Sequence, residues 1–460
     1  MSEPTALSLV PPAVVLVLAI VLRRPILSLM IGTLVGLALY DSANILTNFT
    51  TTSLSVMADE TIGWLILVCG GFGALIVLLV KTGGSMAFGR LAFKLAKGPK
   101  SSLLMAFILG VIIFIDDYLN ALTVGSTMKR VTDKFKVSRE MLAYVVDSTA
   151  APICVLIPLS TWAVFFSGLL VDNGIAGEGQ GIAVYMQAIP YMLYAWFAVA
   201  IVLLVILGVI PAFGPMKKAQ LAAEQGRPAK RQIDRDEIQI SNEYGLKAIE
   251  DEFKNADKGG KLHNFFVPIA LLVGFTVYFD IDVLKGLTAT LAIMLPYYGV
   301  QKLMSLSEMM EQMIDGFKNM LPAIGTVIAA FIFKDVCDKL MLPEFVIGSL
   351  SPYMTPQLLP AVVFLTMSLL AFTTGSSWGI FAVSIPIVMP LAQAVDANIA
   401  LVIGALLSAS SFGSQACFYS DSTVLAAQGT GCNLVSHAVT QLPYTLMAST
   451  MAFVGFLILA

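Results

Sequence analysis

The sequence predicts an all-α polytopic membrane protein built from two inverted-topology repeats, and three observations point to it. First, 57% of the 460 residues are hydrophobic and only 12% are charged, with a mean hydropathy of +0.85. Soluble chains are roughly half apolar and about one-quarter charged, so this composition suits a hydrocarbon solvent and excludes a soluble enzyme. Second, apolar segments recur along the chain. Third, their layout repeats after about 260 residues.

Charge and reactive side chains exclude other classes of protein. The net charge of −3 comes from 27 basic and 30 acidic residues without a basic domain or tail, which is not typical of a nucleic-acid-binding protein. Five cysteines lie in apolar segments without a Cys-x-x-Cys pair, and the two histidines, His263 and His437, are far apart. These residues predict neither a disulfide framework nor a metal cluster. We expect both histidines to be structural, and we predict no enzymatic activity and no cofactor.

Ten apolar segments are candidates for crossing the membrane, because a spanning helix needs roughly 20 apolar residues. They lie near 5–22, 25–40, 62–80, 141–170, 183–210, 265–280, 285–300, 319–334, 398–430 and 437–460. Five precede and five follow a charged segment in the middle of the chain. We therefore expect a first repeat over residues 1–211 and a second over residues 264–460.

The apolar stretch 101–130 does not read as a single span. Lys and Arg residues flank it on both sides, and such residues collect on the cytoplasmic side of a membrane. Both ends should therefore lie on the same side, which predicts a re-entrant helical hairpin. Its tip carries Asp116, Asp117 and Asn120. Polar backbone at membrane depth is tolerated only inside protein or beside a wet cavity, so this tip is a candidate site.

The segment 141–170 is predicted to be a helix that breaks in the membrane. Asp147, Ser148 and Thr149 precede Pro152, and proline removes a backbone donor and disrupts the preceding turn. The freed carbonyls, hydroxyls and carboxylate form an oxygen-rich set that suits a small hard cation. A salt bridge from Asp147 to Lys129, Arg130 or Arg139 is the structural alternative.

The segment 212–263 is predicted to be a cytoplasmic linker. It holds ten basic and nine acidic residues and shows little hydrophobic periodicity. Its balanced charge favours a tether between the two repeats.

The second repeat becomes visible when the sequence is shifted by about 260 residues. The first hairpin then falls within 358–394, the broken helix falls on 398–430, and Ser148 and Ser160 meet Ser408 and Ser420. No Lys or Arg follows Lys339, as expected for a hairpin that opens to the outside. Inverted repeats of this kind are typical of secondary transporters, which bind substrate near the bilayer midplane.

The second repeat carries its own polar centre for an ion or a solute. Gly413 and the hydroxyl cluster around it favour the break in 398–430. The residues of this centre are Thr374, Gly375, Ser376, Ser377, Ser410, Ser411, Gln415 and Asp421. Small hydroxyl residues also serve simply to let membrane helices approach, and this alternative applies to the serines.

Two segments resemble a known family. The stretch from Phe372 to Phe381 contains Gly-Ser-Ser-Trp-Gly, and residues 147–152 read Asp-Ser-Thr-Ala-Ala-Pro. Both are similar to the NhaC-type Na+/H+ antiporter family, over nearly the whole chain. Ser376 stands where that family more often has Thr. The resemblance implies two inverted repeats with re-entrant hairpins and broken helices, a homodimer with a static and a moving part, and exchange of sodium for protons.

The leading hypothesis is an elevator-type secondary antiporter in the inner (cytoplasmic) cell membrane. Na+ and H+ compete for Asp147, with Asn120, Ser148 and Thr149 as further Na+ ligands and Asp116 and Asp117 nearby. The hairpins and broken helices move against a scaffold formed by spans 5–40 and 265–300. The alternative is a Na+- or H+-coupled transporter of an amino acid or a small carboxylate. A channel is the third hypothesis, and paired inverted hairpins argue against it.

Overall fold

The computed structural model is helical throughout the residues it describes, which are 5–22, 25–177, 180–226, 260–280, 282–342, 344–345, 349, 354–374, 377–418 and 420–460. The helices before residue 226 are η1 (Ala6–Leu9), α1 (Val10–Leu22), α2 (Pro25–Tyr40), α3 (Ile45–Met57), α4 (Glu60–Lys81), α5 (Gly84–Leu95), α6 (Pro99–Ile112), α7 (Asp117–Lys134), α8 (Arg139–Thr149), α9 (Ala151–Leu156), α10 (Thr161–Asp172), α11 (Gly181–Ala188), η2 (Ile189–Tyr191), α12 (Leu193–Leu207) and α13 (Gly214–Glu224). Those after residue 260 are α16 (His263–Tyr278), α17 (Val283–Val300), α18 (Leu306–Lys339), α20 (Leu359–Thr374), α21 (Ser377–Ala394), α22 (Ile399–Ala416), α23 (Asp421–Thr430) and α24 (Leu434–Leu459).

Four to six stretches of the described chain are long and apolar enough to cross a membrane. Single helices provide four of them, at Ile62–Lys81, Val283–Val300, Ile399–Ala416 and Leu434–Leu459. Two bent pairs provide the others, Arg139–Leu156 with Thr161–Val171 at 44° and Gly181–Tyr191 with Leu193–Leu207 at 53°. The prediction of an all-helical polytopic membrane protein is confirmed.

The predicted break in 141–170 is present, and a second one was missed. Helix α8 ends at Thr149, and a single residue separates it from α9. A second gap follows α9, and α10 starts at Thr161. The segment 183–210 was expected to be one straight span, but α11 and α12 meet at an angle of 53°. Pro190 lies in the short η2 turn between them, and its fixed ring interrupts the hydrogen-bond ladder.

Two further differences concern the second half of the chain. Helix α22 runs unbroken through Gly413 and the interruption follows it, at residues 417–420. A Cβ on Gly413 would lie 2.0 Å from the Cβ of Ala371, so this glycine allows α20 to approach α22 closely. The span expected at 319–334 is the C-terminal part of the 34-residue helix α18.

Within each predicted hairpin, the two helical arms pack against each other. Helix α6 contacts α7, and α20 contacts α21. The amide of Asn120, in the second turn of α7, reaches the carbonyl oxygen of Gly110 near the end of α6 at 2.7 Å. The chain therefore turns back between α6 and α7.

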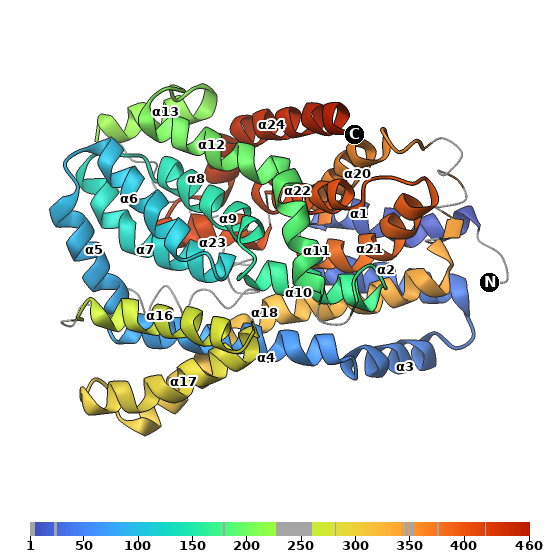
Figure 1. Cartoon of the computed structure of the whole chain (residues 1–460), viewed down its shortest axis with the longest axis horizontal. Helices are drawn as coiled ribbons and strands as arrows, with labels where there is room; N and C mark the ends of the chain where they lie inside the picture. Colours follow the sequence, from blue (N-terminus) through green and yellow to red (C-terminus); the bar gives the residue numbers. More distant parts are fainter. Residues whose placement is uncertain are drawn as a thin grey trace.

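Helices α8, α9 and α22, which adjoin the two breaks, form the interior of the molecule. Every residue from Glu140 to Thr149 and from Leu401 to Ala416 is buried. Figure 1 shows α9 and α22 near the middle of the long axis, with α6 and α7 toward one end and α20 and α21 toward the other. Helices α4, α16, α17 and α18 lie along one long edge. The polar residues of the interior are thus shielded from solvent by many apolar helices.

Candidate functional site at the helix breaks

Asp147 lies one turn before the break between α8 and α9. Ala150 separates the two helices with φ −82° and ψ −98°, outside the helical region. Its amide hydrogen-bonds the carbonyl of Asp147 at 3.3 Å, and Pro152 in the first turn of α9 offers no N–H to continue the ladder. The side chain of Asp147 is 0% exposed, so its carboxylate is held wholly inside the protein.

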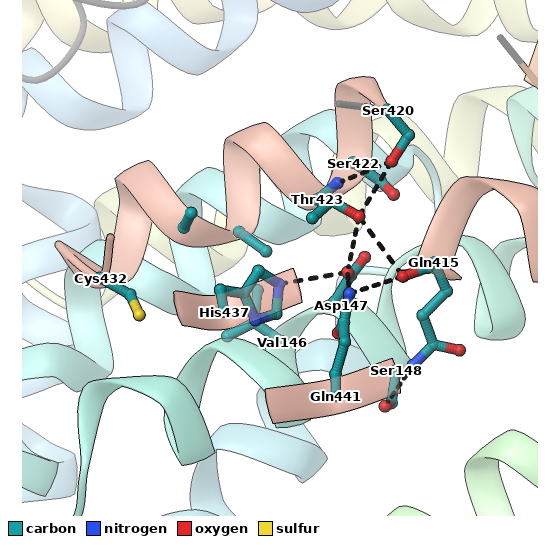
Figure 2. A network of polar contacts seen from close by, with 12 residues as sticks. Val146, Asp147, Ser148, Gln415, Ser420, Ser422, Thr423, Cys432, His437 and Gln441 are labelled. Carbon is teal, nitrogen blue, oxygen red and sulfur yellow. Dashed lines mark hydrogen bonds and ion pairs between the residues drawn. The ribbon is translucent and has the colours of Figure 1, made fainter. Parts of the chain in front are cut away.

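In the described part of the chain, one oxygen of Asp147 makes all of the carboxylate's polar contacts. Oδ2 accepts hydrogen bonds from Nε2 of Gln441 at 2.9 Å and from Oγ1 of Thr423 at 3.2 Å, and it lies 3.2 Å from Nε2 of His437. Oδ1 has no hydrogen-bond partner in the described part of the chain. Figure 2 shows these side chains converging on Asp147. One carboxylate oxygen is therefore fixed and the other is available.

Sequence reasoning missed Thr423, His437 and Gln441 as site residues. His437 was expected to be structural, yet it faces Asp147 and both side chains are 0% exposed. His437 and Gln441 are four residues apart on α24, so they share one face of that helix. A histidine and a glutamine on one face of a predicted membrane span are the signal that would have found them.

The alternative for Asp147, a salt bridge to Lys129, Arg130 or Arg139, is not among its contacts in the described chain, where His437 faces it instead. Arg139 instead pairs with Asp133 at 3.3 Å and donates to the carbonyl of Gly431 at 3.1 Å. Arg130 is exposed.

Gln415 connects the two polar centres that the sequence analysis treated as separate. Its Nε2 donates to Oγ of Ser148 at 2.7 Å, and its Oε1 accepts from the hydroxyl of Tyr194 at 2.7 Å. Its backbone carbonyl accepts from Nε2 of Gln441 at 2.5 Å. Gln415 thus links the second centre to Ser148 and, through Gln441, to Asp147 (Figure 2).

Serines cap the helices that follow both breaks. Oγ of Ser160 accepts from the amide of Ala163 at 3.1 Å and donates to the carbonyl of Cys154 at 2.5 Å. Oγ of Ser420 accepts from the amide of Thr423 at 3.3 Å and donates to the carbonyl of Ser414. Each serine joins the end of one helix to the start of the next, which satisfies backbone groups that have no helical partner.

The predicted hairpin tip braces the break and does not contact the carboxylate of Asp147. Nδ2 of Asn120 donates to the carbonyls of Gly110, Ile113 and Thr149 at 2.7, 3.0 and 2.8 Å. The hydroxyl of Thr149 donates back to carbonyls of its own helix.

The two aspartates of the hairpin tip are both buried. Asp116 accepts from the amide of Tyr118 through Oδ1 at 3.0 Å and from the hydroxyl of Thr161 through Oδ2 at 3.2 Å. Asp116 therefore ties the start of α7 to the start of α10. Asp117 is the first residue of α7.

The remaining predicted residues lie at the ends of α20 to α23. Ser410 and Ser411 are buried in α22. Thr374 ends α20, Ser377 starts α21 and Asp421 starts α23, but their side chains are outside what the structure describes. Gly375 and Ser376 lie outside the described residues altogether.

The donor set around Asp147 suits an alkali cation better than a transition metal. The described residues contain no group of three or more His, Cys, Asp or Glu that could hold a metal ion. Around Asp147 they offer carboxylate, hydroxyl, amide and carbonyl oxygens, which are the ligands that hard cations prefer.

A sequence profile described as the Na+/H+ antiporter family matches residues 153–460. The chain belongs to the Na+/H+ antiporter family. The resemblance expected from the sequence is confirmed, and this family member is a multi-pass membrane transporter and not an enzyme. The matched range includes Thr423, His437 and Gln441, and Asp147 lies just before it.

This antiporter-family protein is similar in sequence to two further proteins. An uncharacterized protein of Haemophilus influenzae is 28% identical over 495 aligned positions, covering 98% of this chain and 90% of the relative. The malate-2H+/Na+-lactate antiporter of Bacillus subtilis is 24% identical over 200 positions, covering 41% of each chain.

Proposed function

We propose that this protein is a secondary antiporter that exchanges Na+ for H+ through the carboxylate of Asp147. The observation that carries the proposal is the geometry of that carboxylate, which is fully buried and has one oxygen fixed by neighbours and one without a hydrogen-bond partner in the described chain. A proton or a sodium ion can occupy the second oxygen, but not both at once.

Competition for one carboxylate provides the coupling. A charged Asp at the centre of a bilayer costs roughly 2.5–3.5 kcal/mol on insertion scales. A carrier with an empty, ionised Asp147 therefore crosses reluctantly, whereas the proton-loaded and sodium-loaded forms cross. Each sodium ion moved one way requires proton movement the other way.

The further oxygen ligands that we assign to Na+ are those nearest to Asp147 in the network. They are the hydroxyl of Thr423, the side-chain oxygen of Gln441, which has no hydrogen-bond partner in the described residues, and the carbonyl of Gln415. Asn120, Ser148 and Thr149, expected as ligands, we assign to holding the break in shape. Their contacts support this, because Asn120 donates to the Thr149 carbonyl and Ser148 accepts from Gln415.

Alternating access is proposed to come from two inverted repeats, and the helix boundaries support it. Both ends of α21 (377 and 394) lie 260 residues after those of α7 (117 and 134). Helix α22 (399–416) stands in the same relation to α8 and α9 together (139–156), and α20 and α23 start 260 residues after α6 and α10. Ser160 and Ser420 occupy equivalent caps, donating to residues 154 and 414.

The moving and static parts are assigned from these packing relations. We place the hairpins α6–α7 and α20–α21 and the broken helices in the moving part. Helices α1 and α2 pack against each other, as do α16 and α17, and we assign these pairs to a scaffold that forms a homodimer. Residues 212–263 are assigned to the cytoplasmic side.

Exchange in proteoliposomes tests the proposal. We expect Asp147→Asn to abolish Na+-driven proton movement, because the amide keeps the shape of the side chain but cannot carry the exchanged proton. Asp315→Asn is the matched control, since Asp315 forms an exposed ion pair with Lys318. Full exchange by Asp147→Asn would remove this residue from the mechanism.

The second candidate is Na+- or H+-coupled transport of a small carboxylate or an amino acid. The relative whose name includes malate and lactate favours it. The solute site would be the second polar centre, near the starts of α21 and α23, since helix N-termini attract carboxylates.

Thermal unfolding of the purified protein separates the two candidates. If Na+/H+ exchange is the whole activity, Na+ alone shifts the melting temperature, and malate, lactate or amino acids add nothing. A solute that raises the melting temperature only in the presence of Na+ would establish the second candidate.

A further inference from the structure

A pocket lies at the start of α8, two turns from Asp147. Its walls come from three places: the turn between α7 and α8, one face of α13, and the turn between α23 and α24. They consist of Asp133, Val137, Ser138, Arg139, Glu140, Ala219, Ala222, Ala223, Gly431, Cys432 and Asn433. The pocket is therefore bounded by both halves of the chain and by the first helix of the charged segment 212–263.

Polar contacts lead from this pocket to the site. Glu140 is buried, and its Oε1 accepts from the hydroxyl of Ser436 at 2.9 Å. Ser436 precedes His437, whose Nε2 lies 3.2 Å from Asp147. Glu140 and Asp147 are seven residues apart on α8, which corresponds to roughly 10 Å along the helix axis. A cation in the pocket is thus within two helical turns of the proposed exchange site.

Gln220 fastens α13 over the pocket. Its Nε2 donates to the carbonyl of Lys136 at 3.1 Å, and its Oε1 accepts from the amide of Ser138 at 3.0 Å. Ser138 is the N-cap of α8, where its hydroxyl accepts from the amide of Met141. One side chain of α13 therefore binds the first turn of the helix that carries Asp147.

Helix α13 is also connected to α8 through stacked rings. Phe213, the N-cap residue of α13, lies with its ring centroid 4.5 Å from that of Tyr444. Tyr444 stacks on Tyr144 of α8 at 4.8 Å. Ala219, Ala222 and Ala223 face the pocket. The start of α13 is anchored by the fully buried Met216 and by the amide of Phe213, which donates to the hydroxyl of Tyr444 at 3.2 Å. The two hydrogen bonds of Gln220 attach the later part of α13 to the α7–α8 turn.

We propose that α13 is a gate on the cytoplasmic route to Asp147 and that Gln220 is its latch. The inference rests on the proposed function, which makes Asp147 the exchange site. When the latch is closed, α13 covers the pocket. When Gln220 releases the α7–α8 turn, the later part of α13 pivots away about its anchored start, and monovalent cations enter along Glu140 to Asp147. Helix α13 then regulates access to the site.

Thiol labelling of Cys432 tests the gate without requiring transport. Cys432 is buried, lines the pocket and forms no disulfide. In a variant with Cys69, Cys154, Cys337 and Cys417 replaced by Ala, a membrane-impermeant maleimide is applied from the cytoplasmic side. We expect Gln220→Ala to raise the labelling rate about tenfold, since loss of two hydrogen bonds shifts a closed–open equilibrium by roughly five- to a hundredfold.

Gln225→Ala is the matched control, because Gln225 is exposed at the end of the same helix. It should label at the rate of the unsubstituted protein. Equal labelling rates for Gln220→Ala and Gln225→Ala would overturn the proposal. Because labelling does not depend on exchange, a failure of Asp147 as the exchange site leaves this result unaffected.

Cross-linking provides a second test, which holds the gate closed instead of opening it. In a variant without native cysteines, Gln220→Cys and Lys136→Cys are joined by a short bifunctional maleimide. We expect Na+/H+ exchange to fall by a factor of about ten or more after cross-linking, whereas each single variant treated with the same reagent keeps its exchange. Unchanged exchange in protein shown by mass spectrometry to be cross-linked would overturn the gate.

Discussion

The carboxylate of Asp147 is held asymmetrically, and this asymmetry is the basis of the proposed exchange. Two donors and His437 converge on Oδ2, while Oδ1 has no hydrogen-bond partner in the described chain. A buried polar atom without a partner normally costs free energy. Such a cost is acceptable where a transported ion or proton restores the missing contact.

Thr423 is the residue that connects Asp147 to the second break. Its hydroxyl faces Oδ2 of Asp147 at 3.2 Å and the carbonyl of Ser414 at 3.1 Å. We expect Thr423→Val to lower the free energy of unfolding by about 1–3 kcal/mol, because buried acceptors lose their donor while the shape is kept. A smaller stabilisation by Na+ should accompany it, and thermal unfolding with and without Na+ measures both effects.

Thr366→Val is the control for this change, since Thr366 is exposed and its hydroxyl donates within its own helix. It should unfold like the unsubstituted protein. If Thr423→Val has the same stability and the same response to Na+, Thr423 does not belong to the cation site.

Asp147 was predictable from the sequence and its partners were not. A carboxylate beside a proline in an apolar segment stands out because it is costly in a membrane. Thr423, His437 and Gln441 lie 276 to 294 positions away along the chain. Their role depends on how α23 and α24 pack against α8, which no local pattern specifies.

At the scale of helices, α4 and α18 approach each other closely along their backbones. A Cβ on Gly73 would lie 2.1 Å from the carbonyl oxygen of Gly316. Small residues allow membrane helices to pack this tightly. The absence of a side chain at Gly73 therefore determines the distance between these two long helices.

We expect Gly73→Ala to destabilise the protein by about 1–3 kcal/mol or more, because a backbone atom cannot move aside and the helices must separate. Gly63→Ala is the control on the same helix, since a Cβ there meets no atom within 4 Å. Melting temperature in detergent measures both. Equal melting temperatures would mean that α4 and α18 do not pack as described.

A helix break was predicted correctly where a single residue type causes it, and the other breaks were missed or misplaced. Pro152 marked the break in 141–170 because proline lacks an amide hydrogen. Gly413 was taken as the second break, but it serves close packing against Ala371 and the interruption follows at residues 417–420. Glycine permits both a bend in a helix and the close approach of a second helix. Which of these roles a glycine has depends on its tertiary contacts.

At the scale of the whole molecule, the proposed exchange site lies between the two halves of the chain. Asp147 and Ser148 belong to the first half, and Thr423, His437, Gln441 and Gln415 to the second. Relative movement of elements from the two halves would therefore change the surroundings of the carboxylate. The all-helical membrane architecture was predictable from the sequence because hydropathy identifies apolar spans.

The inverted arrangement is what would let one carboxylate face each side of the membrane in turn. Single cysteines at the last residues of α7 and α21, Lys134→Cys and Ala394→Cys, are labelled with an impermeant maleimide in right-side-out and inside-out vesicles. Inverted repeats predict that Lys134→Cys reacts only from the cytoplasmic side and Ala394→Cys only from the opposite side. Reaction of both positions from the same side would contradict the inverted repeats and the alternating access built on them.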